Sequence, residues 1–267
     1  MALTFAGSDS GGGAGLQADL KTFAAHGVFG TSVVTAVTAQ NTAEVLGVHV
    51  VDPGFVDLQI DAVLSDLPVG AVKTGMLAST DTVAVVARWA AEGRLPNLVV
   101  DPVLVASTGR PLLGDGGAAS YVRLLLPHAF VVTPNIREAA LLTDAPVDDV
   151  EGMTRAAHRL AETGARVVVI KGGHLAGDRA PDVVLVDGKL HVLDGPRLQS
   201  HNDHGTGCTL SAATAAHLAR GAEPLTALAE AKKFVTTAIA GSATWRLGAG
   251  HGPLDHFGWG PGPRTGS

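Results

Sequence analysis

Apolar residues along the chain follow two spacings, one typical of buried strands and one typical of amphipathic helices. Short uninterrupted aliphatic runs, such as Val167–Ile170, predict strands that are buried on both faces of a sheet. Segments with an apolar residue every three or four positions, such as Leu16–His26 and Thr80–Ala91, predict helices. The two patterns alternate along most of the chain, which predicts an α/β fold with helices on both faces of a central, mostly parallel sheet.

The predicted elements have clear boundaries at glycine, proline and asparagine. Predicted strands cover residues 2–6, 31–39, 45–51, 71–73, 97–101, 129–133, 167–170, 183–186 and 190–193. Predicted helices cover residues 16–26, 55–64, 80–91, 118–126, 137–142, 153–163, the alanine-rich segment after Gly207, and 223–240. No composition break or internal repeat divides the chain, so we expect one domain over residues 1–257. The Gly/Pro-rich residues 258–267 predict a disordered tail.

Composition and charge exclude several classes of function. The net charge of −6 and the absence of a basic run argue against a nucleic-acid partner. No apolar stretch approaches the ~18 residues of a transmembrane helix, so we expect no membrane partner. The first residues lack the basic region and cleavage site of a signal peptide, and the single cysteine fits a reducing compartment. We therefore expect a cytoplasmic protein.

The segment His201–Ser211 is a glycine-bracketed turn that leads into an alanine-rich helix. Gly205 and Gly207 allow a ligand to approach the main chain, and the first N–H groups of a helix favour an anion. Cys208 lies in the first turn, where we expect a lowered thiol pKa and therefore a candidate base. The alternative is a helix start with a buried structural cysteine. The segment does not match the Walker pattern of a P-loop.

Residues with candidate chemistry follow the carboxyl ends of the predicted strands, where α/β sheets bind ligands. They are Gln40, Met76, Asp101, Asn135 with Glu138, and Lys171, and Asp19 follows the first glycine loop. Lys171 precedes two glycines and is either a phosphate ligand or a solvated charge. Asn135 and Glu138 fit a helix-capping box as well as a Mg²⁺ site that is reached through water.

Two of these residues suit a flat heteroaromatic ring. Gln40 offers a donor and an acceptor for a ring edge, although a loop hydrogen bond explains it equally. Met76 either packs on a ring face or fills a gap in the core. The glycine loop Gly7–Gly15 between a strand and a helix suggests a dinucleotide site, but its polar insertion departs from that fingerprint. The histidines show no zinc-ligand spacing, so we expect no structural zinc site.

Seven short motifs occur along the chain in a fixed order. They are Ala6–Thr22, Thr38–Thr42, Val72–Leu77, Val100–Val103, Thr133–Ala139, Lys171–Leu175 and His204–Ser211. In this order they resemble the hydroxymethylpyrimidine/phosphomethylpyrimidine kinases of thiamine biosynthesis, in the ribokinase-like superfamily. The resemblance extends from Leu3 to about Phe257, and seven motifs in register make it specific.

The resemblance implies a ribokinase-like fold, a homodimer, and ATP and Mg²⁺ as phosphoryl donor and metal. It also implies two steps, which convert 4-amino-5-hydroxymethyl-2-methylpyrimidine to its monophosphate and then to its diphosphate. The implied substrate pocket consists of Gln40 at the pyrimidine edge, Met76 on its face, and Gly7, Asp19 and Val103. The implied phosphate and metal site consists of Gly205, Thr206 and Gly207 as the anion hole, Lys171 near the ATP phosphates, and Asn135 and Glu138 for Mg²⁺ and phosphate.

Cys208 falls where sugar kinases of the superfamily carry an aspartate base, so the resemblance implies that it accepts the hydroxyl proton. Asp203 departs from the family, which commonly has threonine between the equivalents of Asn202 and His204. An additional carboxylate near an anion site is unfavourable unless it points away or meets Mg²⁺.

Two other functions stay open: a pyridoxal kinase, and a non-catalytic sensor of a vitamin precursor on the same fold. The presence of Cys208, Glu138 and Lys171 argues against the sensor.

Overall fold

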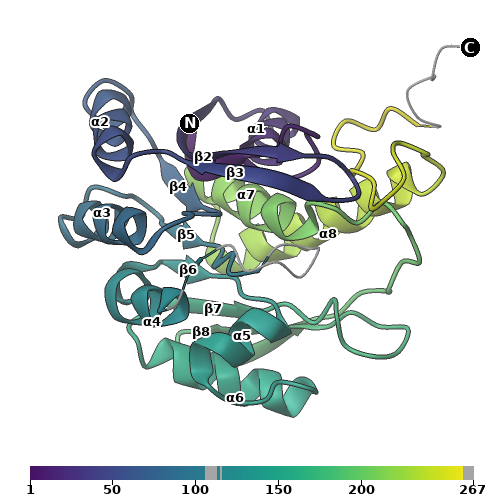
Figure 1. The fold of residues 1–267 in the computed structure, drawn as a ribbon. Helices are drawn as coiled ribbons and strands as arrows, with labels where there is room; N and C mark the ends of the chain where they lie inside the picture. The colour runs from purple at the N-terminus through teal and green to yellow at the C-terminus, as the bar shows by residue number, and fades with distance from the viewer. Residues whose placement is uncertain (106–112, 115, 261–267) are drawn as a thin grey trace, which may run out of the picture.

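Nine strands form a single sheet in a computed structural model that describes residues 1–105, 113–114 and 116–260 (Figure 1). The order across the sheet is β3-β2-β1-β4-β5-β6-β7-β8-β9. The strands from β2 to β7 in this order run parallel, whereas β3 runs antiparallel to β2, β8 to β7, and β9 to β8. The strands are β1 (Ala2–Ser8), β2 (Gly30–Gln40), β3 (Val45–Val50), β4 (Ala71–Thr74), β5 (Val99–Val100), β6 (Val131–Val132), β7 (Val167–Ile170), β8 (Asp182–Val186) and β9 (Lys189–Leu193).

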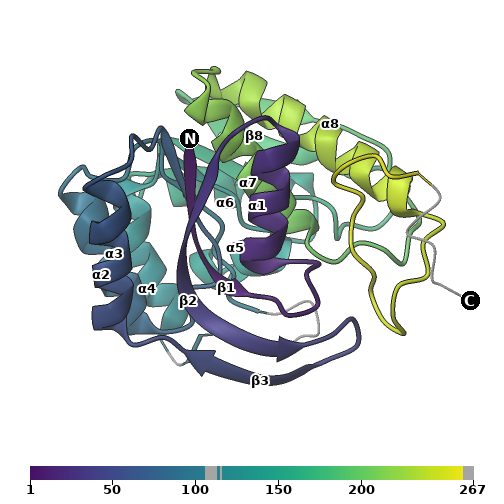
Figure 2. The same cartoon turned by 90° about the horizontal axis from the view of Figure 1, so that it is seen from above.

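Helices cover both faces of this sheet, as Figures 1 and 2 show. One face carries α1 (Gly15–Ala25), α7 (Thr206–Ala219) and α8 (Pro224–Ser242). The other face carries α2 (Pro53–Leu64), α3 (Thr80–Ala91), α4 (Gly117–Ser120), α5 (Ile136–Thr143) and α6 (Val150–Ala161). The α/β, mostly parallel architecture predicted from the sequence is therefore confirmed.

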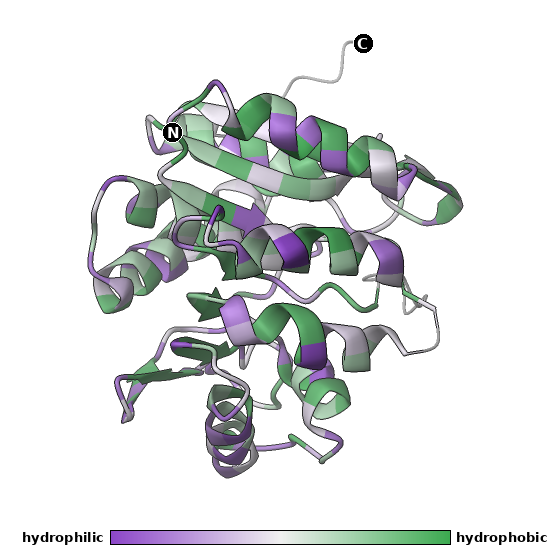
Figure 3. Cartoon of the chain, turned by 90° about the vertical axis from the view of Figure 1, so that its left-hand side faces the viewer, coloured by the Kyte–Doolittle hydropathy of each residue, from purple (hydrophilic) through white to green (hydrophobic). Residues whose placement is uncertain are grey.

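Successive residues of the central strands point into different cores. Val99 packs in the core beneath α7 and α8, and Val100 packs in the core beneath α3 and α6. This explains why the strands read as uninterrupted apolar runs, since both faces are buried. Hydrophobic residues dominate the strands, while the helices mix hydrophobic and hydrophilic positions (Figure 3).

Most predicted element bounds agree with the structure, and the differences have local causes. The helix α3 and the strand β7 have the predicted bounds, but β5 and β6 are each only two residues long. Pro102 and Pro134 follow them closely, and proline cannot donate a ladder hydrogen bond. The predicted helix over residues 118–126 is α4 followed by a π-helical turn (Tyr121–Leu125) and a 3₁₀ turn (Leu126–His128) that contains Pro127.

The segment after α8 folds back onto the start of α7 instead of leaving the molecule. The Gly252 carbonyl accepts a hydrogen bond from the His204 N–H (3.1 Å), and the Asn202 side chain donates to the Ser242 carbonyl (2.6 Å). Within the predicted tail, the Gly260 carbonyl accepts a hydrogen bond from the indole of Trp245 (2.8 Å). The rest of that predicted tail, residues 261–267, lies outside the described residues. Within the described residues, no helix is both long and apolar enough to cross a membrane.

Candidate active site

Two glycine loops meet at the start of α7. Gly205 precedes this helix with a φ of 88°, and a Cβ at Gly205 would lie 2.0 Å from the carbonyl oxygen of Gly13. No residue with a side chain fits that contact without moving one loop. The first N–H groups of α7 therefore open at the junction of the two loops, which is the geometry of an anion site.

Cys208 lies in the first turn of α7 and is partly exposed, but packed protein surrounds its thiol. Burial raises the pKa of Cys208 to about 11, although the nearby Lys73 ammonium and a hydrogen bond from the Gly15 backbone act to lower it. The predicted lowering of this pKa by the helix start is therefore wrong for the ligand-free protein, because desolvation outweighs the favourable charges.

Asp19 is held in a fully buried ion pair beneath these loops. Lys73 donates to both carboxylate oxygens of Asp19, at 3.0 and 2.8 Å, and the Thr4 hydroxyl donates to one of them at 2.6 Å. The side chains of Lys73 and Asp19 are both 0% exposed. Both oxygens of Asp19 therefore already have partners, and direct contact with a substrate remains a prediction for this residue.

A second lysine–carboxylate pair faces the start of α7. Lys171 follows β7 and donates to Asp101 at 2.9 Å, and Ser211 of α7 donates to the other oxygen of Asp101 at 3.3 Å. A Cβ at Gly207 would lie 3.1 Å from the Lys171 ammonium nitrogen. The glycine thus leaves room for a cation directly beside the predicted anion hole.

Asn135 and Glu138 form the capping box of α5. The Asn135 side chain accepts hydrogen bonds from the backbone N–H groups of Arg137 and Glu138, and the Glu138 carboxylate accepts one from the Asn135 N–H at 2.8 Å. Burial raises the pKa of Glu138 to about 7, against the opposing effect of the Lys171 charge. The capping role is confirmed, and the metal role remains a prediction. Within the described residues, no group of three or more His, Cys, Asp or Glu side chains forms a metal site.

The residues predicted to bind a ring lie around the end of β1. A Cβ at Gly7 would lie 3.4 Å from the Met76 methyl group, so Met76 packs across this strand. Gln40 ends β2, and its amide nitrogen lies 3.2 Å from Nε2 of His204. Val103 follows β5, is partly exposed, and donates its N–H to the Asp101 carbonyl at 2.9 Å.

Asp203 points toward the C-terminal segment. Its carboxylate lies 2.6 Å from Nδ1 of His251, and both side chains are largely exposed. The backbone carbonyl of Asp203 accepts from the Thr206 N–H at 3.3 Å, which tightens the turn. The additional carboxylate therefore has a partner outside the anion site.

Sequence reasoning assigned no role to three polar residues of this region, Asp9, Lys73 and His204, and placed a fourth, Asp101, only by its position at a strand end. Asp9 accepts hydrogen bonds from three backbone N–H groups of its own loop and lies 3.1 Å from His204. Lys73 and Asp101 anchor the two lysine–carboxylate pairs. The position of Lys73 at the end of a predicted strand was a usable signal, as was the position of His204 directly before Gly205.

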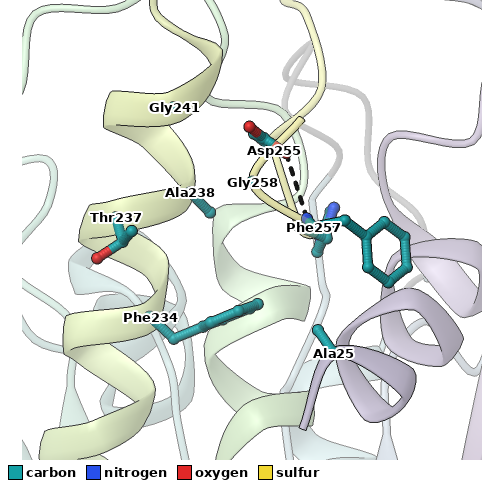
Figure 4. A pocket seen from close by; sticks show the side chains of 9 residues that line it. Ala25, Phe234, Thr237, Ala238, Gly241, Asp255, Phe257 and Gly258 are labelled. Carbon is teal, nitrogen blue, oxygen red and sulfur yellow. Dashed lines mark hydrogen bonds between the residues drawn. The ribbon is translucent and has the colours of Figure 1, made fainter. Parts of the chain in front are cut away.

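A pocket of the described residues lies elsewhere, away from the two glycine loops. It has a volume of about 310 Å³ and lies between the ends of α1 and α8 and the C-terminal segment (Figure 4). Its lining includes Phe234, Ala238 and Phe257, and its carboxylate Asp255 already accepts from three backbone N–H groups. We assign no substrate to it, because the residues with phosphate and ring chemistry are at the glycine loops.

The comparison with protein families agrees with this geometry. The model of the family described as phosphomethylpyrimidine kinase matches residues 9–255. The chain belongs to this family. It is therefore a phosphotransferase with a ribokinase-like fold, as the sequence predicts.

Curated relatives with this name cover nearly the whole chain. The hydroxymethylpyrimidine/phosphomethylpyrimidine kinase of Rhizobium meliloti is 48% identical over 260 residues, which are 96% of this chain and 97% of that protein. The one from Escherichia coli is 43% identical, with 96% and 97% covered. The thiamine biosynthesis bifunctional protein ThiED of Geobacter sulfurreducens is 49% identical, but the chain spans only 52% of its length.

Solved structures include two kinds of vitamin kinase. The ADP complex of Bacillus subtilis pyridoxal kinase superposes with a TM-score of 0.87 at 36% identity, covering 96% of each chain. The phosphomethylpyrimidine kinase of Clostridium difficile superposes with a TM-score of 0.79 at 39% identity, covering 89% of this chain and 98% of that one. Both kinds of kinase share this fold, so the fold alone does not determine which ring is the substrate.

Proposed function

We propose that the protein transfers the γ-phosphoryl group of ATP to 4-amino-5-hydroxymethyl-2-methylpyrimidine and then to the resulting monophosphate, as a step of thiamine biosynthesis. The observation that carries this proposal is the start of α7, where open N–H groups, a glycine contact and the Lys171 ammonium converge. In the first transfer, the hydroxymethyl oxygen bonds to the γ-phosphorus as the bond to the ADP oxygen breaks. Charge stabilisation and positioning supply most of the acceleration of such a reaction.

The transferring group would lie against the backbone of Gly205, Thr206 and Gly207. Lys171 would approach the ATP phosphates from the end of β7, and it is already beside Gly207. Asn135 belongs to the same edge, since it forms an isolated bridge with Lys171. In this arrangement the Lys171 ammonium would lie near the phosphate oxygens that gain negative charge as the bond to ADP breaks.

Mg²⁺ fits the carboxylates of this edge. It commonly takes one or two protein carboxylates together with water and substrate phosphates. Glu138 and Asp101 both act on the charge of Lys171, and one oxygen of Glu138 already receives the Asn135 N–H. We propose that Glu138, with Asn135, would hold the ion, which would neutralise phosphate charge when bound.

The pyrimidine would lie between Met76 and the end of β2, with Gln40 at its edge and Gly7 and Val103 around it. Gly7 leaves the space that the Met76 methyl group occupies. Asp19 would support this pocket from beneath, through Lys73. The hydroxymethyl group would then face the first turn of α7.

Cys208 is the proposed acceptor of the hydroxyl proton in the first transfer. With a pKa of about 11, only about one thiol in a thousand is ionised at pH 8, three units lower. A base contributes little to a loose phosphoryl transfer until the bond to phosphorus is formed, so proton transfer can be late. We expect Cys208→Ala to slow the first transfer and to affect the second less, because a phosphate acceptor is already ionised. An unchanged first rate would remove Cys208 from this role.

The direct test is ADP release with purified protein, ATP and the hydroxymethylpyrimidine, with and without Mg²⁺. We expect turnover only with Mg²⁺ and a product that proceeds from monophosphate to diphosphate, as read by phosphorus NMR. Absence of turnover with this substrate under conditions where the protein is folded and binds ATP would reject the proposed function.

Pyridoxal phosphorylation is the second candidate, because solved pyridoxal kinases superpose closely on the chain. The same assay with pyridoxal in place of the pyrimidine separates the two. We expect the pyrimidine to have the higher kcat/KM, since Gln40 offers a donor and an acceptor to a ring edge that carries both.

We also propose that the active form is a cytoplasmic homodimer. The ribbon of β2 and β3 curves away from the rest of the molecule (Figure 2), and one face of β3 carries the exposed apolar side chains of Leu46 and Val50. An exposed apolar sheet face of this kind favours a protein partner. Light scattering after gel filtration should give twice the chain mass, and Leu46→Asp should shift it to the monomer.

A further inference from the structure

His204 joins three segments that lie far apart in the sequence. Its Nε2 lies 3.1 Å from Oδ2 of Asp9 and 3.2 Å from the amide nitrogen of Gln40. Its ring also lies against the first glycine loop, where a Cβ at Gly13 would lie 2.6 Å from it. The residue therefore connects the glycine loop, the end of β2 and the start of α7.

A single ring nitrogen cannot serve both polar neighbours as they stand. Nε2 of a histidine carries either a proton or a lone pair, so it cannot donate to Asp9 and accept from Gln40 at once. Charge decides between them, because a carboxylate is the stronger acceptor. Asp9 also receives N–H groups from Gly13 and Ala14 at the same oxygen, so this oxygen is an anion that collects donors. His204 therefore donates its Nε2–H to Asp9.

A half-turn of the Gln40 amide removes the remaining conflict. The two ends of an amide are nearly alike in shape, and the hydrogen-bond network decides which end faces which neighbour. The Thr38 hydroxyl lies 3.4 Å from the Gln40 amide oxygen, but its one proton is donated to the Ser8 carbonyl at 2.9 Å. After the half-turn, the Gln40 NH₂ group donates to the Thr38 hydroxyl oxygen. The Gln40 amide oxygen then faces the Nε2–H of the His204 ring. The single Nε2–H of His204 then lies between two acceptors, Oδ2 of Asp9 at 3.1 Å and the Gln40 oxygen, as a bifurcated hydrogen bond.

We propose that His204, held by Asp9, is a positioning residue that fixes the Gln40 amide with its oxygen toward α7 and its NH₂ toward Thr38, and so selects an aminopyrimidine ring. The inference rests on the proposed function. In this ring the amino group neighbours the carbon that bears the hydroxymethyl group, and the ring nitrogen lies one position further away. With the hydroxymethyl group facing Cys208, the amino group meets the Gln40 oxygen and the ring nitrogen meets the Gln40 NH₂. The opposite amide orientation would place donor against donor.

The test is a double-mutant cycle of His204→Phe and Gln40→Ala, read as KM and kcat for the hydroxymethylpyrimidine. We expect His204→Phe to raise the KM for the pyrimidine about 10-fold, while kcat and the KM for ATP change less than about 3-fold. In the Gln40→Ala background the same substitution should change the KM less than about 2-fold, because its effect passes through Gln40. His204→Gln, which keeps an N–H donor, should recover part of the loss.

The substrate analogue that lacks the 4-amino group gives a second readout. The natural-sequence protein should prefer the aminopyrimidine over it, and His204→Phe should lose most of this preference. His251→Phe is the matched control, because His251 also pairs with an aspartate but is largely exposed and lies outside the site. We expect this control to leave every constant unchanged.

Several outcomes would overturn the inference. They are equal loss in both backgrounds of the cycle, a parallel rise in the KM for ATP, or an unaltered preference between the two substrates. Should His204→Phe fail to fold, Thr38→Val replaces it, since it removes the partner at the other end of the amide. An unchanged KM for Thr38→Val then rejects the inference. Failure of the proposed function is distinct, since the unsubstituted protein would then show no pyrimidine turnover at all.

Discussion

Two lysine–carboxylate pairs lie near the start of α7, and they differ in access to solvent. Lys73 and Asp19 are both 0% exposed, whereas Lys171 keeps 14% of its side chain exposed and Asp101 keeps 3%. Each lysine lies beside a glycine, since a Cβ at Gly75 or Gly207 would lie 2.7 or 3.1 Å from its ammonium nitrogen. The difference in exposure indicates which cation could contact a phosphate at the predicted anion hole. Lys171 keeps partial access to solvent beside Gly207, whereas Lys73 is fully enclosed by protein.

The largest effect should come from breaking the Lys73–Asp19 pair, which we call the inner pair because it is fully buried. Lys73→Met leaves the Asp19 carboxylate buried without its cation, so we expect the free energy of unfolding to fall by about 3–5 kcal/mol. Urea denaturation measures it. The double variant Lys73→Met/Asp19→Asn removes both charges and should recover much of the stability. A loss below about 1 kcal/mol for Lys73→Met would show that the inner pair is not buried as described.

Breaking the Lys171–Asp101 pair, which we call the outer pair, should reduce the catalytic rate more than it reduces stability. Lys171→Met removes the ammonium group beside Gly207, and we expect kcat to fall about 10²–10³-fold, as for the loss of one preorganised charge at a transferring group. Stability should change less than for Lys73→Met, because Asp101 retains the hydroxyl groups of Ser211 and Thr133 as hydrogen-bond donors. ADP release and urea denaturation on the same preparation measure both. A fall in stability as large as that of Lys73→Met would erase the distinction between the pairs.

The reactivity of the Cys208 thiol tests whether burial outweighs the effect of the Lys73 ammonium on the thiol pKa. Because burial holds its pKa at about 11, the rate of alkylation by iodoacetamide in the ligand-free protein should rise about 10-fold per pH unit between pH 8 and 10. The thiolate is the reactive form, so the sign follows from deprotonation as the pH rises. A rate that levels off near pH 8.5 would indicate an ordinary thiol pKa and would show that burial does not raise the pKa of Cys208.

The smallest effect should come from a pair at the surface. Arg179 contacts Asp194 through its guanidinium group, but both side chains are about half exposed. Solvent screens such a pair, so Arg179→Ala should leave the urea midpoint and the kinetic constants unchanged within error. This variant is the surface control for the two buried pairs. A clear loss of stability for Arg179→Ala would mean that the exposure of an ion pair does not predict how much its loss destabilises the protein.

Local patterns in the sequence predict the sheet and most helices, because strand and helix periodicities are properties of neighbouring residues. The bounds of α3 and β7 illustrate this. The chemistry of individual side chains depends on distant partners, and the sequence does not reveal these. Cys208 is the clearest example: its helix position predicts a low pKa, but packing against α1 and β4 determines a high one.

Site residues show the same limit. Glu138 caps a helix, as its spacing with Asn135 indicates, and only its burial distinguishes it from an ordinary cap. The contact of His204 with Gln40 spans 164 positions and has no local signature. The strand-end rule did predict that Asp101, Asn135 and Lys171 lie together, because neighbouring parallel strands end at the same edge of a sheet.

The return of the C-terminal segment to His204 has a consequence for how the protein is made. Residue 204 is bound on one side by the loop at Asp9 and on the other by the carbonyl of Gly252. During translation, the amino-terminal strands emerge long before either contact can close. The turn before α7 therefore closes fully only after residue 252 has left the ribosome, so a shorter nascent chain cannot yet hold the start of this helix in the conformation described.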